Sequence, residues 1–283
     1  MRRPEEQVDL VGPGNSYTRL FFHGDRPVLV HVEQRGDLEQ PSCDVALSGE
    51  VREEDRDWAA ETVRWILHDH CPLEDFYSHI TAADPSFPLA ASARGLRTPL
   101  SPTLFETLVF AILGQQVNLT FAYRCKAALE AGYTRCAIID GQEYLAALTP
   151  EDLDGAQIPD LHAQKISNAK SRAILELAES FRSEPLDRRK LAGKSSEEIS
   201  ALLTSFRGIG PWTAAYSMIK ALGTLDVLPG GDAGLQNAVK RWRGMERKPT
   251  SDEVHAIGEL WGPYKALATF YLWTGLIEQD KEG

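Results

Sequence analysis

The chain has 283 residues, a formal net charge of −11 and four cysteines, a length that suits one large or two smaller domains. No apolar run approaches the roughly 18 residues of a membrane span, and no secretory segment follows Met1. We therefore expect a cytoplasmic protein. The cysteines are scattered without Cys-x-x-Cys spacing, which predicts reduced thiols rather than a metal site, at Cys43, Cys71, Cys125 and Cys136.

The negative charge is unevenly distributed along the chain. Residues 1–94 hold 9 Lys and Arg against 18 Asp and Glu, residues 95–250 hold 19 against 17, and residues 251–283 hold 2 against 6. Because phosphate contacts depend on the local charge, the middle segment can still bind nucleic acid. The absence of a strongly basic segment predicts contact with few phosphates.

The first ninety residues predict a mixed α+β domain. Strand-type composition covers residues 17–22, 27–32 and 44–49, with a turn at 23–26. Apolar residues at helical spacing then predict a helix over residues 53–69. We place this N-terminal domain at residues 1–90.

The remaining chain, residues 91–283, predicts an almost entirely helical domain. Short Gly, Pro and Asp breaks separate segments with apolar residues at three- and four-residue spacing. These predicted helices cover residues 102–113, 117–131, 141–147, 162–182, 196–206, 211–222, 233–242, 251–260 and 263–277.

The most specific motif is the sequence Phe-Arg-Gly-Ile-Gly-Pro-Trp-Thr-Ala at residues 206–214, between two predicted helices. Its glycines permit positive φ and close backbone approach, and Pro211 suits the first position of a helix. The free N–H groups at this helix start form an anion site. The pattern predicts a phosphate-binding hairpin whose contacts come from Gly208, Ile209, Gly210 and Thr213, with Ile209 tying the hairpin into the core.

Four blocks of the sequence together resemble the helix-hairpin-helix DNA glycosylases, in particular the 3-methyladenine DNA glycosylase II branch. They are the hairpin at 206–214, Phe-Ala-Ile-Leu-Gly-Gln-Gln-Val at 110–117, Leu-Pro-Gly-Gly-Asp-Ala-Gly-Leu at 228–235, and residues 263–273. The resemblance covers about residues 95–276. It implies a mostly α fold with an N-terminal domain like a TATA-binding-protein repeat.

Asp232, 22 residues after Gly210, is the candidate catalytic residue. Taken alone, an Asp before a helical stretch is most often an N-cap. The resemblance implies that this carboxylate stabilises the positive charge that develops on the sugar and orients the attacking water. The two roles are compatible. Asp226 is a competing carboxylate, but it precedes Pro229, where the family's loop does not place the catalytic group.

Trp212, Tyr216 and Trp273 are the candidate base-binding residues. Trp212 and Tyr216 are four residues apart and share a helix face, which by itself also fits an aromatic core cluster. The resemblance implies a pocket, where indole faces attract electron-deficient alkylated purines by about 0.5–2 kcal/mol. Family members that cut the strand carry a lysine where this chain has Trp212, which implies hydrolysis without lyase activity. Lys220, two turns further on, should not replace it.

The resemblance also assigns DNA contacts and a possible ion. Gln115 and Gln116 lie at a turn, where Gln116 corresponds to the side chain that fills the gap left by a flipped base; solvent-exposed turn glutamines are the alternative. No cofactor is required, although a monovalent cation could bind carbonyls of Thr204, Phe206 and Ile209. No iron–sulfur cluster is expected, since no cysteine follows Cys136. The spacing of His68 and His70 does not fit a metal-binding helical pair.

The sequence therefore predicts a monofunctional DNA glycosylase for alkylated bases, acting in base excision repair as a monomer on duplex DNA. A glycosylase for deaminated or oxidised bases is one alternative. A non-catalytic helix-hairpin-helix DNA-binding module is another, although such a module needs no carboxylate beside an aromatic pocket.

Overall fold

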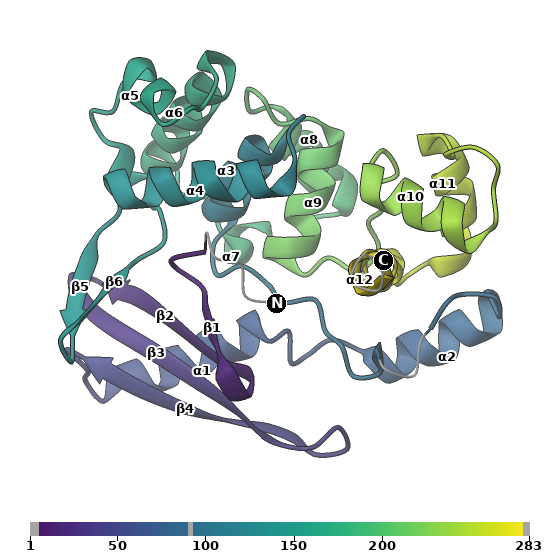
Figure 1. Ribbon diagram of the computed structural model, residues 1–283, viewed down its shortest axis with the longest axis horizontal. Helices are drawn as coiled ribbons and strands as arrows, with labels where there is room; N and C mark the ends of the chain where they lie inside the picture. Colours follow the sequence, from purple (N-terminus) through teal and green to yellow (C-terminus); the bar gives the residue numbers. More distant parts are fainter. Residues whose placement is uncertain (1–5, 90–92, 280–283) are drawn as a thin grey trace. The chain divides into compact units, whose positions relative to one another are not determined.

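The computed structural model describes residues 6–89 and 93–279 (Figure 1). Contacts divide the chain into two compact units, each assembled from separate segments. Unit 1 comprises residues 1–65, 102–187 and 206–208, and unit 2 comprises residues 66–101, 188–205 and 209–283. The domain boundary predicted near residue 90 stays a prediction about the sequence.

Unit 1 begins with a four-stranded antiparallel sheet, β1(Leu10–Gly12), β2(Ser16–His23), β3(Arg26–Gly36) and β4(Pro41–Gly49), in sequence order. Three of these strands and the helix α1(Glu54–Ile66) were predicted, whereas the short β1 was not. Successive side chains of a strand point to opposite faces, so Val28 and Val30 pack with Ala59 and Val63 of α1. Figure 1 shows α1 running along one face of this sheet.

A second, two-stranded sheet replaces the helix predicted over residues 141–147. β5(Cys136–Ile139) and β6(Gln142–Leu145) form an antiparallel hairpin. Asp140 and Gly141 at its turn have φ of 52° and 79°, the conformation in which Asp-Gly favours a tight hairpin. The helix prediction was wrong because the preference of Asp-Gly for a hairpin turn is stronger than the helical preference of a short segment with apolar residues at helical spacing. Ile139 and Ala146 pack with Leu20 and Leu29 on the sheet face opposite α1.

Besides α1, the helices of unit 1 are α3(Leu104–Gly114), α4(Leu119–Tyr133), α5(Ile158–Ala163) and α6(Asn168–Ser183). The side chains of Thr103, Asn118 and Ser167 cap the N-termini of α3, α4 and α6. The helix predicted over residues 162–182 is two helices, because Lys165 has φ of 65° and interrupts it. Short 3₁₀ turns, η1(Pro13–Asn15) and η3(Glu151–Leu153), complete the unit.

The regular elements in the described part of unit 2 are all helices: α2(Leu73–Ala83), α7(Arg188–Leu191), α8(Ser196–Thr204), α9(Pro211–Leu222), α10(Ala233–Trp242), α11(Ser251–Gly258), η4(Glu259–Trp261) and α12(Lys265–Gln279). Its core gathers Phe76 of α2, Leu235 of α10, Trp261 of η4 and Leu267 of α12. The Tyr271 hydroxyl lies 2.6 Å from that of Tyr77. This core fixes α10 and α12 beside each other, which is the arrangement that builds the candidate site.

Candidate active site

Asp232 stands at the start of α10 and is its N-cap. Its Oδ1 accepts a hydrogen bond from the backbone N–H of Leu235 at 2.7 Å, as the sequence predicted for a cap. The following turn is tight around this carboxylate: a Cβ on Gly234 would lie 3.1 Å from Asp232 Oδ1 and 3.5 Å from the Trp273 ring. Glycine at position 234 therefore leaves room for the carboxylate and the indole to meet.

Two indole N–H groups converge on the same carboxylate. Trp212 Nε1 of α9 donates to Asp232 Oδ2 at 2.8 Å, and Trp273 Nε1 of α12 donates to Asp232 Oδ1 at 2.8 Å. Together with the Leu235 N–H, three N–H groups donate hydrogen bonds to the two carboxylate oxygens. Because the carboxylate oxygens accept all three of these hydrogen bonds, the orientation of the side chain is fixed.

This use of the two tryptophans was not predicted from the sequence. The prediction was that their ring faces meet the base, whereas in the structure their N–H groups also bind the carboxylate. The available signal is general: a partly buried indole N–H usually finds an acceptor, and Asp232 is the acid of the adjacent motif.

Tyr216 completes an aromatic cluster with the two indoles. The Trp212 and Tyr216 rings stack at a centroid distance of 5.4 Å and an angle of 21°. Tyr216 and Trp273 lie 6.3 Å apart at 49°. All three side chains are half-buried, unlike the fully buried Trp261 of the core. The structure thus brings together the predicted catalytic and base-binding residues, and their roles stay predictions.

The hairpin at 206–214 has two glycines with different backbone conformations. Gly208 has φ of 78°, in the left-handed region that favours glycine. Gly210 has φ of −95° and precedes Pro211, the first residue of α9. The expectation of positive φ therefore holds for Gly208 and is wrong for Gly210. A Cβ on Gly210 would meet no atom within 4 Å, so the described part of the protein does not itself crowd a side chain there.

The other predicted hairpin contacts differ in accessibility. The Ile209 side chain is buried, at 5% exposure, as expected for an anchor. Thr213, in the first turn of α9, is only 1% exposed with its main chain included, so it offers a phosphate almost no accessible surface. The DNA contacts predicted for these residues stay predictions.

The two turn glutamines are placed differently. Gln115 is half-buried, and its Nε2 donates to the Gly208 carbonyl at 2.8 Å. Gln116 is exposed and has φ of 55°. The structure therefore gives Gln115 an internal partner and leaves Gln116 accessible for the predicted insertion into DNA.

The remaining candidates lie outside the carboxylate cluster. Asp226, the competing carboxylate, forms an ion pair with Lys265 at 3.3 Å. Lys220 Nζ donates to the Pro99 carbonyl at 2.5 Å. His68 is buried, and burial lowers its pKa to about 4. Within residues 6–89 and 93–279 no cluster of His, Cys, Asp or Glu could hold a metal ion. The carbonyls of Thr204, Phe206 and Ile209 are neutral oxygen donors, which suit a hard cation.

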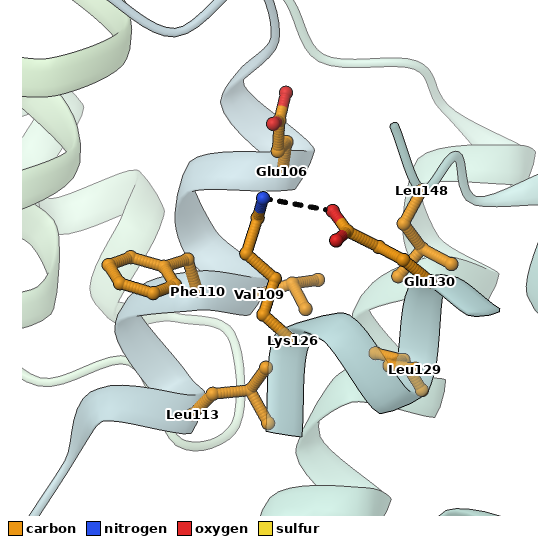
Figure 2. Close-up of a pocket in the computed structure, with 8 residues that line it drawn as sticks. All are labelled: Glu106, Val109, Phe110, Leu113, Lys126, Leu129, Glu130 and Leu148. Carbon is orange, nitrogen blue, oxygen red and sulfur yellow. Dashed lines mark ion pairs between the residues drawn. The ribbon is translucent and has the colours of Figure 1, made fainter. Parts of the chain in front are cut away.

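A small pocket in unit 1 has a buried ion-pair cluster at its polar end (Figure 2). Lys126 Nζ lies 3.0 Å from Glu130 Oε1 and 2.6 Å from Glu6 Oε1. Burial raises the pKa of Glu130 to about 8, against the pull of Lys126. Nearby, Arg19 bonds Glu106 at 2.7 Å and joins β2 to α3. These buried charges are paired with one another, which is consistent with a structural role in joining the sheet to the helices.

The sequence of the chain is similar to those of known DNA repair proteins. Residues 109–263 match the model of the HhH-GPD superfamily base excision DNA repair proteins. DNA-3-methyladenine glycosylase of Bacillus subtilis is 35% identical over 229 residues, which cover 76% of this chain and 73% of that protein. DNA-3-methyladenine glycosylase 2 of Escherichia coli is 29% identical, covering 65% and 62% of the two chains.

The solved structures extend the likeness to the fold of nearly the whole chain. The 3-methyladenine DNA glycosylase of Archaeoglobus fulgidus superposes with a TM-score of 0.79 at 23% identity, covering 94% of this chain and 88% of that one. In the part of the chain that is described, no helix is long and apolar enough to cross a membrane. The chain belongs to the HhH-GPD superfamily of base excision DNA repair proteins.

Proposed function

We propose that this protein is a monofunctional DNA glycosylase that hydrolyses the N-glycosidic bond of alkylated, 3-methyladenine-type bases in duplex DNA. The observation that carries the proposal is the Asp232 carboxylate, held by three N–H donors between two half-buried indoles. The names of the Bacillus subtilis and Escherichia coli relatives support the same substrate class.

The arrangement of Asp232 suits the charge that this reaction develops. As the bond from sugar to base breaks, positive charge accumulates on the sugar, as in other glycoside hydrolyses. A carboxylate held in place beforehand stabilises that charge without reorganising during the reaction. The same oxygens can orient a water molecule that attacks the sugar on the face opposite the departing base. The Trp212 and Trp273 N–H groups contribute by holding the carboxylate in one orientation.

The aromatic cluster suits an electron-deficient base. Alkylated purines carry positive charge or strong electron deficiency, and aromatic faces attract such rings. Tyr216, Trp212 and Trp273 supply three such rings around Asp232. Since the bond to an alkylated base is already weak, departure of the base needs no strong general acid. A deaminated or oxidised base would gain less from the same rings.

The proposed absence of lyase activity rests on two residues of α9, Trp212 and Lys220. Strand cleavage by this family needs an amine that attacks the sugar, and Trp212 offers none. Lys220 lies on the same helix, and its amine donates to the Pro99 carbonyl. We therefore propose that water is the nucleophile and that an abasic site is the product.

DNA binding would combine the hairpin with the exposed turn residue. Main-chain N–H groups at the start of α9 can meet a phosphate, and Gly210 leaves the space for it. Gln116 would fill the gap left by the flipped base. A monovalent cation on the carbonyls of residues 204, 206 and 209 would add positive charge at the backbone. We propose a monomer acting on duplex DNA that contains a damaged base.

Base release from duplex oligonucleotides, each carrying one lesion, tests the proposal. The set contains 3-methyladenine, 7-methylguanine, hypoxanthine, uracil and 8-oxoguanine, and chromatography measures the free base. We expect release of the methylated purines by the wild-type protein and none by Asp232→Asn. Release confined to hypoxanthine, uracil or 8-oxoguanine would favour the alternative substrate class. Tight DNA binding without any release would favour a non-catalytic binding module.

A further inference from the structure

The turn between α3 and α4 adopts a conformation that needs support from elsewhere in the chain. Gln116 has φ of 55° although it is not glycine, and its side chain is exposed. The turn also follows the C-terminus of α3, where the last carbonyls have no partner within the helix. Gln116, the residue proposed to insert into DNA, therefore has a backbone conformation that costs free energy to maintain.

Lys170 binds the carbonyls on both sides of the end of α3. Its Nζ donates to the Leu113 carbonyl at 2.8 Å and to the Gln115 carbonyl at 2.7 Å. An ammonium group is favourable at a helix C-terminus and unfavourable in the first turn of a helix. Lys170 lies in the first turn of α6 and is half-buried, so its place in its own helix is unfavourable and its contact with α3 is the favourable one.

The same face of α6 also supports the hairpin entry. Ala173, one turn after Lys170, packs so close to Gly208 that a Cβ on Gly208 would lie 2.8 Å from the Ala173 Cβ. Gln115 links the turn directly to the hairpin, because its Nε2 donates to the Gly208 carbonyl at 2.8 Å. Helix α6 thus touches the turn and the first hairpin glycine, and these two are bonded to each other.

We propose that Lys170 is a positioning residue for base flipping: it holds the α3–α4 turn so that Gln116 projects toward the DNA, with Gln115 and Gly208 as the second support. The inference rests on the proposed function. Lys170 acts through the turn and makes no contact with the base or the sugar. A flipping enzyme needs this rigidity because a small misplacement of a positioning group lowers the rate strongly.

The test compares Lys170→Met with Lys170→Arg and with Arg172→Met. Arg172 is exposed on the same helix, so the control removes one positive charge from α6 without touching the turn. Single-turnover base release at saturating enzyme measures the flipping and chemical steps together. Fluorescence of 2-aminopurine beside the lesion measures flipping directly. Thermal melting checks that each variant is folded.

We expect Lys170→Met to lower the single-turnover rate about 10-fold, the loss expected for hydrogen bonds from a charged donor. Lys170→Arg, which keeps a cationic donor, should stay within about 3-fold of wild type. The decisive substrate carries the lesion opposite an abasic site, so that the damaged base has no pairing partner. Since such a base is already unpaired, flipping it costs less and the Lys170→Met defect should shrink to about 2-fold or less.

A wild-type rate in Lys170→Met, or a defect that is equal for paired and unpaired lesions, would overturn the role of Lys170. If Lys170→Met does not fold, Gln115→Leu, which removes the bond to Gly208, must show the same dependence on pairing. Absence of base release by the wild-type protein would refute the proposed function instead. The two failures are therefore distinguishable.

Discussion

Replacing Asp232 by Asn tests the electrostatic role of the carboxylate while changing its shape little. The Asn side chain keeps one oxygen, which can cap α10 and accept from Trp273, so the cap is retained. Its amide nitrogen would replace Oδ2 and face the Trp212 N–H, which now lies 2.8 Å from an acceptor. The variant thus loses the negative charge and one charge-assisted hydrogen bond.

The magnitude follows from these two losses. A unit charge about 4 Å from a cationic sugar, at an effective dielectric constant of about 20, contributes roughly 4 kcal/mol, or about 10³-fold in rate. Removal of single donors at comparable sites costs about 10²–10³-fold. We therefore expect base release by Asp232→Asn to fall at least about 10²-fold. The lost bond from Trp212 should lower the free energy of unfolding by about 1.5–3 kcal/mol.

The assay measures single-turnover release of a methylated purine, together with melting temperature and binding to abasic DNA. Asp226→Asn is the matched control, because it removes an exposed carboxylate whose partner is Lys265. Binding should survive in Asp232→Asn, and the control should release base at the wild-type rate. If Asp232→Asn lost only stability, with an unchanged rate per folded molecule, Asp232 would be a helix cap and the catalytic assignment would be wrong.

Other residues carry four further predictions. Because Trp212 offers no amine, borohydride should trap no protein–DNA adduct and strands should break only after hot alkali; a trapped adduct would show that another amine attacks the sugar. Gly210→Ala should leave the melting temperature unchanged yet weaken binding to all duplexes about equally, whereas Gly208→Ala should lower the melting temperature, because its Cβ would collide with α6. The slope of log K against log salt should correspond to roughly three to five phosphates, and a steep slope or normal binding by Gly210→Ala would place the DNA contacts elsewhere. Burial lowers the pKa of His68 to about 4. The unfolded chain therefore binds this proton more readily than the folded state. The contribution of His68 to the free energy of unfolding is complete above about pH 6.5 and falls as the pH is lowered toward 4, by at most about 3 kcal/mol. Urea unfolding at pH 7 and 4.5 should show this loss for wild type and less of it for His68→Asn; equal losses would contradict the assignment.

Several elements could be predicted from the sequence because their signals are local. The bounds predicted for α9 and α10 match the structure, since Pro211 begins one helix and Asp232 caps the other. The hairpin β5–β6 was missed although Asp140 and Gly141 carried a local turn signal. The apolar spacing over residues 141–147 is too short to stabilise a helix against that turn.

The division of the chain into compact units depends on contacts between distant segments. Residues 102–187 belong with the N-terminal sheet, and residues 66–101 belong with the C-terminal helices. Buried bonds such as that from Arg19 to Glu106 join segments 87 residues apart. Neither composition nor periodicity reports such pairings, because both describe only neighbours along the chain.

By itself, the sequence determined which residues are chemically able to act. It contains the hairpin with its two glycines and the acid 22 residues later. It also contains the aromatic residues of the site, with Trp212 at the position where strand-cutting relatives have a lysine. Only the tertiary structure decided how they are used: α9, α10 and α12 bring two indole N–H groups to one carboxylate, and Lys170 reaches the end of α3. The physical reason is that a hydrogen bond needs its donor and acceptor within about 3 Å, and only packing of separate helices sets that distance.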